Sequence, residues 1–155
     1  NNVMIIDNNT FSDCGSLKNI VVPDSVKNIG NSAFADCGAL ETVYMSVNVN
    51  FIPTECFYND AVLSSFTWES ASKLIGRLAF GNCTSLNTFN FIGIEKLYEN
   101  SFQNSGILGG IIGAAQQVIS CQHRQHGGLA DVIAVADGIH IKVVKCLYQR
   151  SALSS

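Results

Sequence analysis

The chain has 155 residues, 47% of them apolar and only 14% charged, with a net charge of −3. This length and composition suit a single buried core, while the weakly acidic balance argues against nucleic-acid binding and against a polybasic contact with a membrane surface. Six cysteines are too few for a disulfide scaffold, and the most apolar run, residues 106–115, is too short for insertion into a membrane, so we expect neither.

A repeat of 23 residues starts near the N-terminus. Its clearest marker is a phenylalanine that recurs at this interval and then once more after 22 residues: Phe11, Phe34, Phe57, Phe80 and Phe102. A leucine follows six residues after each of them: Leu17, Leu40, Leu63, Leu86 and Leu108. Self-similarity at a fixed period is typical of a solenoid, in which each unit buries its apolar side against the next. We therefore predict a solenoid of about five units over residues 1–108, followed by a second region, 109–155.

Each unit contains two apolar blocks. Apolar residues three and five positions after the leucine, as in Leu40, Val43 and Met45, predict a short strand with one buried face. A second block follows eleven or twelve residues after the leucine, as at Ile29 and Ile52, and predicts a second short strand or turn. Stacked side by side, such strands would form parallel sheets around a continuous core.

The residues between the inward positions of the first strand project outward. They would form an almost uncharged face rich in hydroxyl and amide groups, on the sheet that is usually concave in a repeat solenoid. We predict that eight of them bind a ligand: Asn19, Val21, Thr42, Tyr44, Ser65, Thr67, Thr88 and Asn90. Tyr44 is the best single anchor, because tyrosine is enriched at binding hot spots. The alternative is that these residues are simply a solvated surface.

One position of the repeat holds Cys14, Cys37 and Cys83, and the same position holds Asp60 and Ser105 in the other two units. A disulfide between Cys14 and Cys37 is possible if the units stack directly. The alternative is a ladder of free thiols that pack as small apolar groups. We favour free thiols, because a position that accepts aspartate or serine does not require a bridge.

Residues 109–155 keep only part of the pattern. Leu129, Val132 and Ala134 hold the strand spacing one unit later, which predicts a degenerate continuation of the solenoid, partly disordered, although a foreign segment or a frameshifted sequence would also fit. Both ends of the chain fall inside a unit and lack polar caps, so we expect a fragment of a longer array.

The same region contains Cys121, His123 and His126, which are residue types that bind zinc. No fourth ligand is evident, so we predict no metal site and no cofactor. His123, Cys121 and Asp131 could in principle supply a base, a nucleophile and an orienting carboxylate, but no nucleophile motif surrounds them. Phosphate loops and the G-x-S-x-G motif are also missing, so we expect no enzyme.

The unit is clearest in residues 29–40, which read Ile-Gly-Asn-Ser-Ala-Phe-Ala-Asp-Cys-Gly-Ala-Leu. This pattern resembles the BspA-like leucine-rich repeat, which is also seen in treponemal surface proteins. The resemblance covers residues 1–108. It implies an α/β leucine-rich-repeat solenoid that is mostly β: a right-handed superhelix with short parallel strands on the concave face and short strands or 3-10 turns on the convex side.

The resemblance also implies a function. Proteins of this kind are associated with adhesion, so we expect a non-catalytic module of a cell-surface or secreted protein that binds a host-cell or matrix protein, such as fibronectin, or a glycan. The alternative is a cytoplasmic scaffold or regulatory interaction protein, since the family also occurs without secretion signals.

Overall fold

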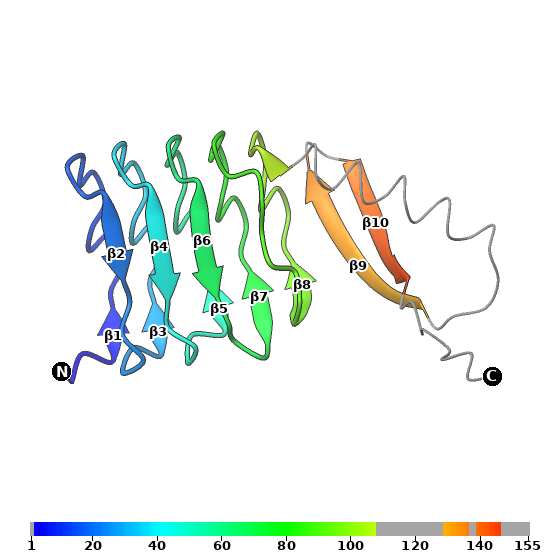
Figure 1. The fold of residues 1–155 in the computed structure, drawn as a ribbon, viewed down its shortest axis with the longest axis horizontal. Coiled ribbons are helices and arrows are strands. Elements are labelled where there is room, and N and C mark those ends of the chain that lie inside the picture. Colours follow the sequence, from blue (N-terminus) through cyan, green and yellow to red (C-terminus); the bar gives the residue numbers. More distant parts are fainter. Residues whose placement is uncertain (1, 108–128, 137–138, 147–155) are drawn as a thin grey trace, which may run out of the picture.

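The computed structural model describes residues 2–107 in full and, beyond them, the backbone of two strands (Figure 1). The chain winds through successive coils, and each coil contributes a short strand to one or both of two opposite walls. The ten strands are β1 (Ile5–Ile6), β2 (Asn19–Val21), β3 (Asn28–Ile29), β4 (Thr42–Met45), β5 (Phe51–Ile52), β6 (Ser65–Trp68), β7 (Lys73–Ile75), β8 (Ile94–Leu97), β9 (Leu129–Ala136) and β10 (Ile139–Cys146). The predicted leucine-rich-repeat solenoid is confirmed.

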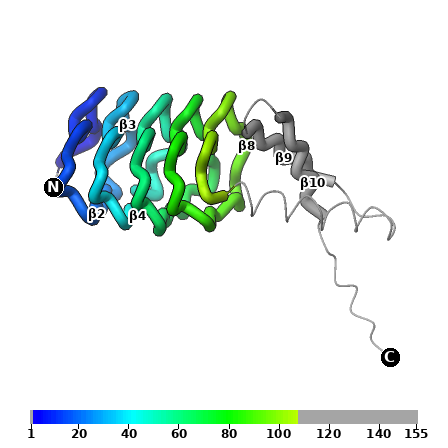
Figure 2. The backbone as a smooth tube through the Cα atoms, turned by 90° about the horizontal axis from the view of Figure 1, so that it is seen from above, coloured from blue at the N-terminus to red at the C-terminus, as the bar shows by residue number. Residues whose placement is uncertain are grey.

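The 23-residue period appears directly in the strand register. In the sheet β2-β4-β6 all strands are parallel, and Asn19 pairs with Thr42, which pairs with Ser65. The opposite wall holds β1-β3 and β5-β7-β8, again parallel. Seen from above, the two sets of strands line opposite sides of the stack (Figure 2). Equivalent residues of successive units therefore lie side by side and form straight columns.

A proline divides the opposite wall. Gly30 and Gly76 each donate their N–H to an isoleucine carbonyl of the preceding coil at 2.7 Å. Pro53 takes the same position in the intervening coil and has no N–H to donate. The hydrogen-bonded ladder therefore stops between β3 and β5, which splits this wall into two sheets.

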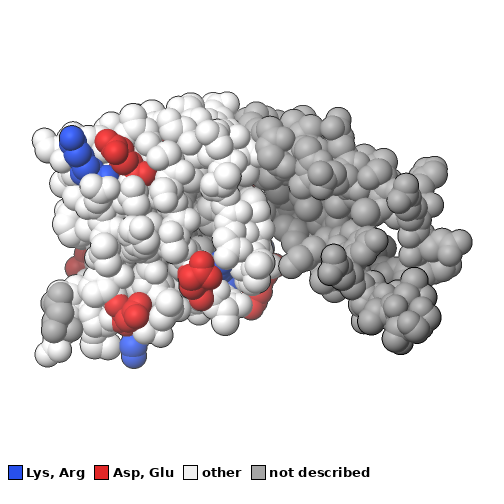
Figure 3. Space-filling view, in the orientation of Figure 1, with Lys and Arg blue, Asp and Glu red and all other residues white. Residues whose placement is uncertain are grey.

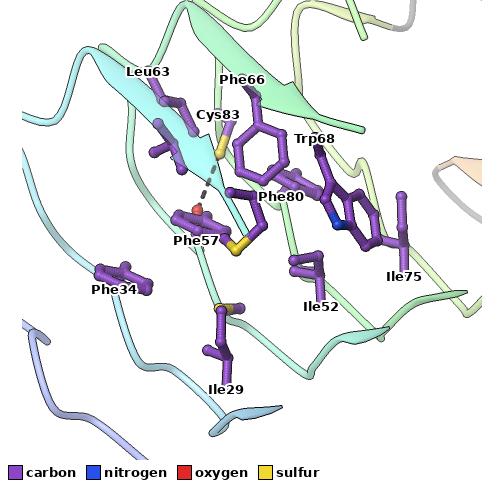
Figure 4. Close-up of a cluster of buried hydrophobic side chains, with 14 of the residues drawn as sticks. Ile29, Phe34, Ile52, Phe57, Leu63, Phe66, Trp68, Ile75, Phe80 and Cys83 are labelled. Carbon is purple, nitrogen blue, oxygen red and sulfur yellow. Dashed lines mark hydrogen bonds between the residues drawn. The ribbon is translucent and has the colours of Figure 1, made fainter. Parts of the chain in front are cut away.

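The repeated phenylalanines form the centre of the core (Figure 4). Their rings stack nearly parallel with centroids 5.1 to 5.5 Å apart, in the order Phe11, Phe34, Phe57, Phe80, Phe102. Trp68 fills the same core from β6, and its Nε1–H donates to the Val49 carbonyl at 2.8 Å. Aromatic rings at contact distance contribute both buried area and favourable pair geometry, so this column holds each coil to the next.

The turns around each phenylalanine need left-handed backbone. Ten residues other than glycine have a positive φ of 52° to 64°, and they fall into two columns with the same 23-residue spacing. One column is Asp13, Asp36, Asn59, Asn82 and Asn104, and the other is Asn9, Ser32, Glu55, Leu78 and Asn100. Asparagine and aspartate tolerate this conformation better than other L-residues, which explains their recurrence in the repeat.

The fourth coil departs from the predicted pattern. A strand was expected at residues 88–91 beside β6, but none forms there. The carbonyl of Asn90 accepts a hydrogen bond from Lys73 Nζ at 3.2 Å, and the Asn90 side chain accepts one from the Ile92 N–H at 3.0 Å. This coil is also one residue shorter, which appears as a register shift between Lys73 and Leu74 where β7 pairs with β8. The local bonds of Asn90 and the lost residue therefore replace regular pairing with β6.

β9 lies beside β8, and it pairs with β10 (Figure 1). The two strands are antiparallel, with Ile139 opposite Ala136 and Cys146 opposite Leu129. Successive coils of the repeat pair in parallel, so residues 129–146 do not have the parallel pairing that their spacing suggested. Whether 109–155 continues the array stays a prediction.

Candidate functional site

The outward face of β2, β4 and β6 is the predicted binding surface. Val21, Tyr44 and Thr67 lie next to one another across the three strands. Val21 is 68% exposed and Tyr44 is 51% exposed, while Thr67 is half-buried. An aliphatic side chain and an aromatic side chain therefore stand in contact order on a flat sheet, with a hydroxyl beside them.

A second outward row runs parallel to the first. Asn19 and Ser65 are exposed and Thr42, between them, is half-buried. These side chains offer two hydroxyls and one amide, each able both to donate and to accept a hydrogen bond. The face as a whole supplies apolar contact in one row and neutral hydrogen-bonding groups in the other.

Charge is confined to the rim of this face. Figure 3 shows the surface over β2, β4 and β6 almost without charged side chains. Lys18 and Glu41 precede β2 and β4, are exposed, and lie in neighbouring coils whose backbones are joined by a bond from the Glu41 N–H to the Lys18 carbonyl at 2.7 Å. One cation and one anion side by side leave no net field, so the face suits a neutral ligand surface.

The inward side of the same strands holds the face rigid. Val43, Met45, Phe66 and Trp68 alternate with the outward residues and are all buried. Phe66 packs edge-on against Phe57, with centroids 5.2 Å apart. Outward side chains on a backbone fixed from below lose little further freedom when a ligand binds, which favours affinity.

Six of the eight predicted residues are brought together on this face. Thr88 is exposed and Asn90 is half-buried, but they belong to the segment that forms no strand, and Asn90 is occupied by its bonds to Lys73 and Ile92. The columns therefore end at Ser65 and Thr67. Ligand binding by the whole set stays a prediction.

The cysteine column contains free thiols within the described residues. Cys14, Cys37, Cys56 and Cys83 are unbridged. Burial raises the pKa of Cys37 to about 11 and raises the pKa of both Cys56 and Cys83. The thiolate is the reactive form of cysteine, so these environments make poor nucleophiles. The column is built for packing.

An exposed aromatic group on the opposite wall escaped the sequence analysis. Phe51 and Tyr98 are each 39% exposed, and their rings lie 6.1 Å apart. Lys96 Nζ lies 4.3 Å from the Tyr98 ring centroid, at cation–π distance. Phe51 shares a register with Leu74, so the outward positions of the second apolar block, read in the same way as those of the first, would have revealed it.

Two classes of site were also examined in the described part of the chain. No group of three or more histidine, cysteine or acidic residues is arranged to hold a metal ion there. None of the helices described is long and apolar enough to cross a membrane. The predicted zinc-type residues Cys121, His123 and His126 lie outside the described residues.

Known proteins were compared with this chain. Residues 1–108 match the family model described as BspA type leucine rich repeat region, in six copies. The crystal structure of a leucine-rich repeat protein from Treponema pallidum, TpLRR, is similar at 33% identity and a TM-score of 0.53, over 55% of this chain and 40% of that one. A leucine-rich repeat protein from Eubacterium ventriosum is similar at 23% identity and a TM-score of 0.48, over 64% and 34%. The chain thus spans well under half the length of either. No curated protein sequence matches.

Proposed function

Since this chain belongs to the BspA-type leucine-rich repeat family, we propose that it is a non-catalytic binding module that uses the outward face of β2, β4 and β6. The observation that carries the proposal is the exposed pair Val21 and Tyr44, placed side by side on a rigid, uncharged sheet. Monomeric surfaces tolerate scattered apolar residues, but a tyrosine held flat beside an aliphatic neighbour and ringed by hydrogen-bonding groups matches the composition of binding hot spots.

The partner class follows from the same face. No deep polar pocket or charged cluster has been found there, so a ligand would be held by many modest contacts spread over several coils, and affinity would rise with their number. This arrangement suits a protein surface or a neutral glycan. As a family expectation, we propose a host-cell or matrix protein, with fibronectin the first probe, and a cell-surface or secreted location.

The proposal is tested by binding to immobilised fibronectin and to a panel of neutral and acidic glycans. The variants are Tyr44→Ala on the candidate face and Phe51→Ala on the opposite wall, which removes a comparably exposed aromatic ring. We expect Tyr44→Ala to weaken binding about tenfold or more, a typical hot-spot effect, and Phe51→Ala to leave it unchanged. Equal binding by both variants, or loss only with Phe51→Ala, would reject the candidate face.

A second candidate is an intracellular scaffold or regulatory interaction protein. It is favoured by the four unbridged thiols of the described residues, which are compatible with a reducing compartment. Protease added to intact source cells distinguishes the two locations. Removal of the protein would support the surface role, and its survival until the cells are lysed would support the scaffold.

A further inference from the structure

Asp60 is a buried carboxyl group in the cysteine column, and the candidate binding face makes no use of it. The residue is fully buried, and it takes the place of Cys37 in the coil before and of Cys83 in the coil after. A buried carboxylate without a cation is far less favourable than a neutral, hydrogen-bonded group. Asp60 must therefore either be paired with a cation or carry a proton.

The neighbouring cysteines show what this position requires. The thiol of Cys37 donates to the carbonyl of Phe11 with Sγ 3.1 Å from the oxygen, and the thiol of Cys83 donates to the carbonyl of Phe57 at 3.0 Å. In both cases the acceptor is the phenylalanine of the preceding coil, 26 residues earlier. The position is thus built for a hydrogen-bond donor.

The same relation assigns the carbonyl of Phe34 to Asp60. Elsewhere in the column the backbone N–H donates to the phenylalanine carbonyl three residues earlier, as from Cys83 to Phe80 at 3.3 Å. In this coil the N–H of Cys37 donates instead to Asp60 Oδ1 at 2.8 Å. Within residues 2–107 the structure gives neither the Phe34 carbonyl nor Asp60 Oδ2 a hydrogen-bond partner. Two buried acceptors lie at one place, and a single proton would satisfy both.

We infer that Asp60 is protonated in the folded protein, with Oδ2–H donating to the Phe34 carbonyl while Oδ1 accepts the Cys37 N–H, and that loss of this proton releases the central coil. The neutral carboxyl then clamps the turn of the preceding coil through two hydrogen bonds. Ionisation removes the donor, places a negative charge beside a carbonyl oxygen and leaves that charge buried.

The groups facing Asp60 all favour its protonated form or are neutral. They are the thiols of Cys37, Cys56 and Cys83 and, from the neighbouring turn, the carboxylate of Asp36. The one ion pair within residues 2–107, Arg77 with Glu55, does not involve Asp60. Burial raises the pKa of Asp60 to about 8; the bond from the Cys37 N–H lowers it and Asp36 raises it further.

The raised pKa sets the direction of the pH effect. Between about pH 4 and about pH 8 the folded chain holds a proton that the unfolded chain has released. Stability from this group is therefore fully present below about pH 4 and is lost as the pH rises towards about 8. In that window the folding equilibrium constant falls by up to about tenfold for each pH unit.

The test is urea unfolding of the whole chain between about pH 5 and about pH 8, where the buried thiols with raised pKa values do not ionise. Asp60→Asn replaces the acid with a permanently neutral group that has the same acceptor and a donor for Phe34. Asp13→Asn is the matched control, since it removes an exposed carboxylate from the position that Asn59 fills in a later coil. We expect the wild type and Asp13→Asn to lose stability in parallel as the pH rises, and Asp60→Asn to stay nearly constant. A flat wild-type profile, or an equal fall in Asp60→Asn, would overturn the inference.

A direct titration covers the case in which Asp60→Asn does not fold. The carboxyl carbon of Asp60, followed by NMR in the wild-type protein, should titrate well above the usual aspartate range. A midpoint near pH 4 would show a carboxylate in the folded state and would overturn the inference regardless of the variant.

Discussion

Replacing Phe34 with alanine would remove the middle of the aromatic column. The ring is fully buried and stacks on Phe11 at 5.2 Å and on Phe57 at 5.1 Å, so both neighbours lose a face. Phenylalanine-to-alanine changes in well-packed cores cost about 3 to 5 kcal/mol, as the sum of lost transfer free energy and the cavity left behind. A stack of coils can relax only along its axis, so we expect a value within that range.

The assay is urea unfolding followed by the fluorescence of Trp68, the one tryptophan of the chain, which is buried one coil further along. Phe51→Ala is the control: its ring is 39% exposed on the opposite wall, and its loss should cost less than about 1.5 kcal/mol. A cost below about 1 kcal/mol for Phe34→Ala, or a larger cost for Phe51→Ala, would refute the inward placement of the repeated phenylalanine.

Three further predictions concern single features of the coil. Tyr44→Ala should change the free energy of unfolding by less than about 0.5 kcal/mol, because the ring is outward, and a large loss in thermal unfolding would mean that the strand face is reversed. A reducing agent should leave the unfolding midpoint unchanged, because the thiols are free, and a marked drop would indicate a bridge between Cys14 and Cys37. Glu55→Asn should stabilise by about 0.5 kcal/mol, since its φ of 55° suits asparagine and its pair with Arg77 is long and exposed; destabilisation would show that this pair outweighs the backbone strain.

Much of the fold was predictable because a solenoid repeats one local solution. The 23-residue interval between Phe34 and Phe57 fixed the register, and alternation around Val43 fixed which side of β4 is buried. Both predictions depend on spacing alone, which is why they survive in the pairing of Asn19 with Thr42. The outward placement of Tyr44 followed from the same alternation.

The departures came from interactions that spacing does not encode. Asn90 keeps its place in the repeat, but its carbonyl bonds the amine of Lys73, a contact between segments that only the folded coil brings together. The antiparallel pairing of β9 and β10 likewise depends on a turn whose effect the apolar pattern could not show. The missing ladder between β3 and β5 was readable in principle, since Pro53 stands where glycine donates an N–H in two other coils.

Hydrogen exchange with and without a bound ligand tests the central claim most directly. The ligand is whichever matrix protein or glycan the chain retains in the binding panel, and the readout is the change in amide protection by segment. We predict added protection over β2, β4 and β6, strongest in the peptide that contains Tyr44. Added protection confined to the opposite wall, around Phe51 and β8, would contradict the account and move the binding surface to the aromatic group there.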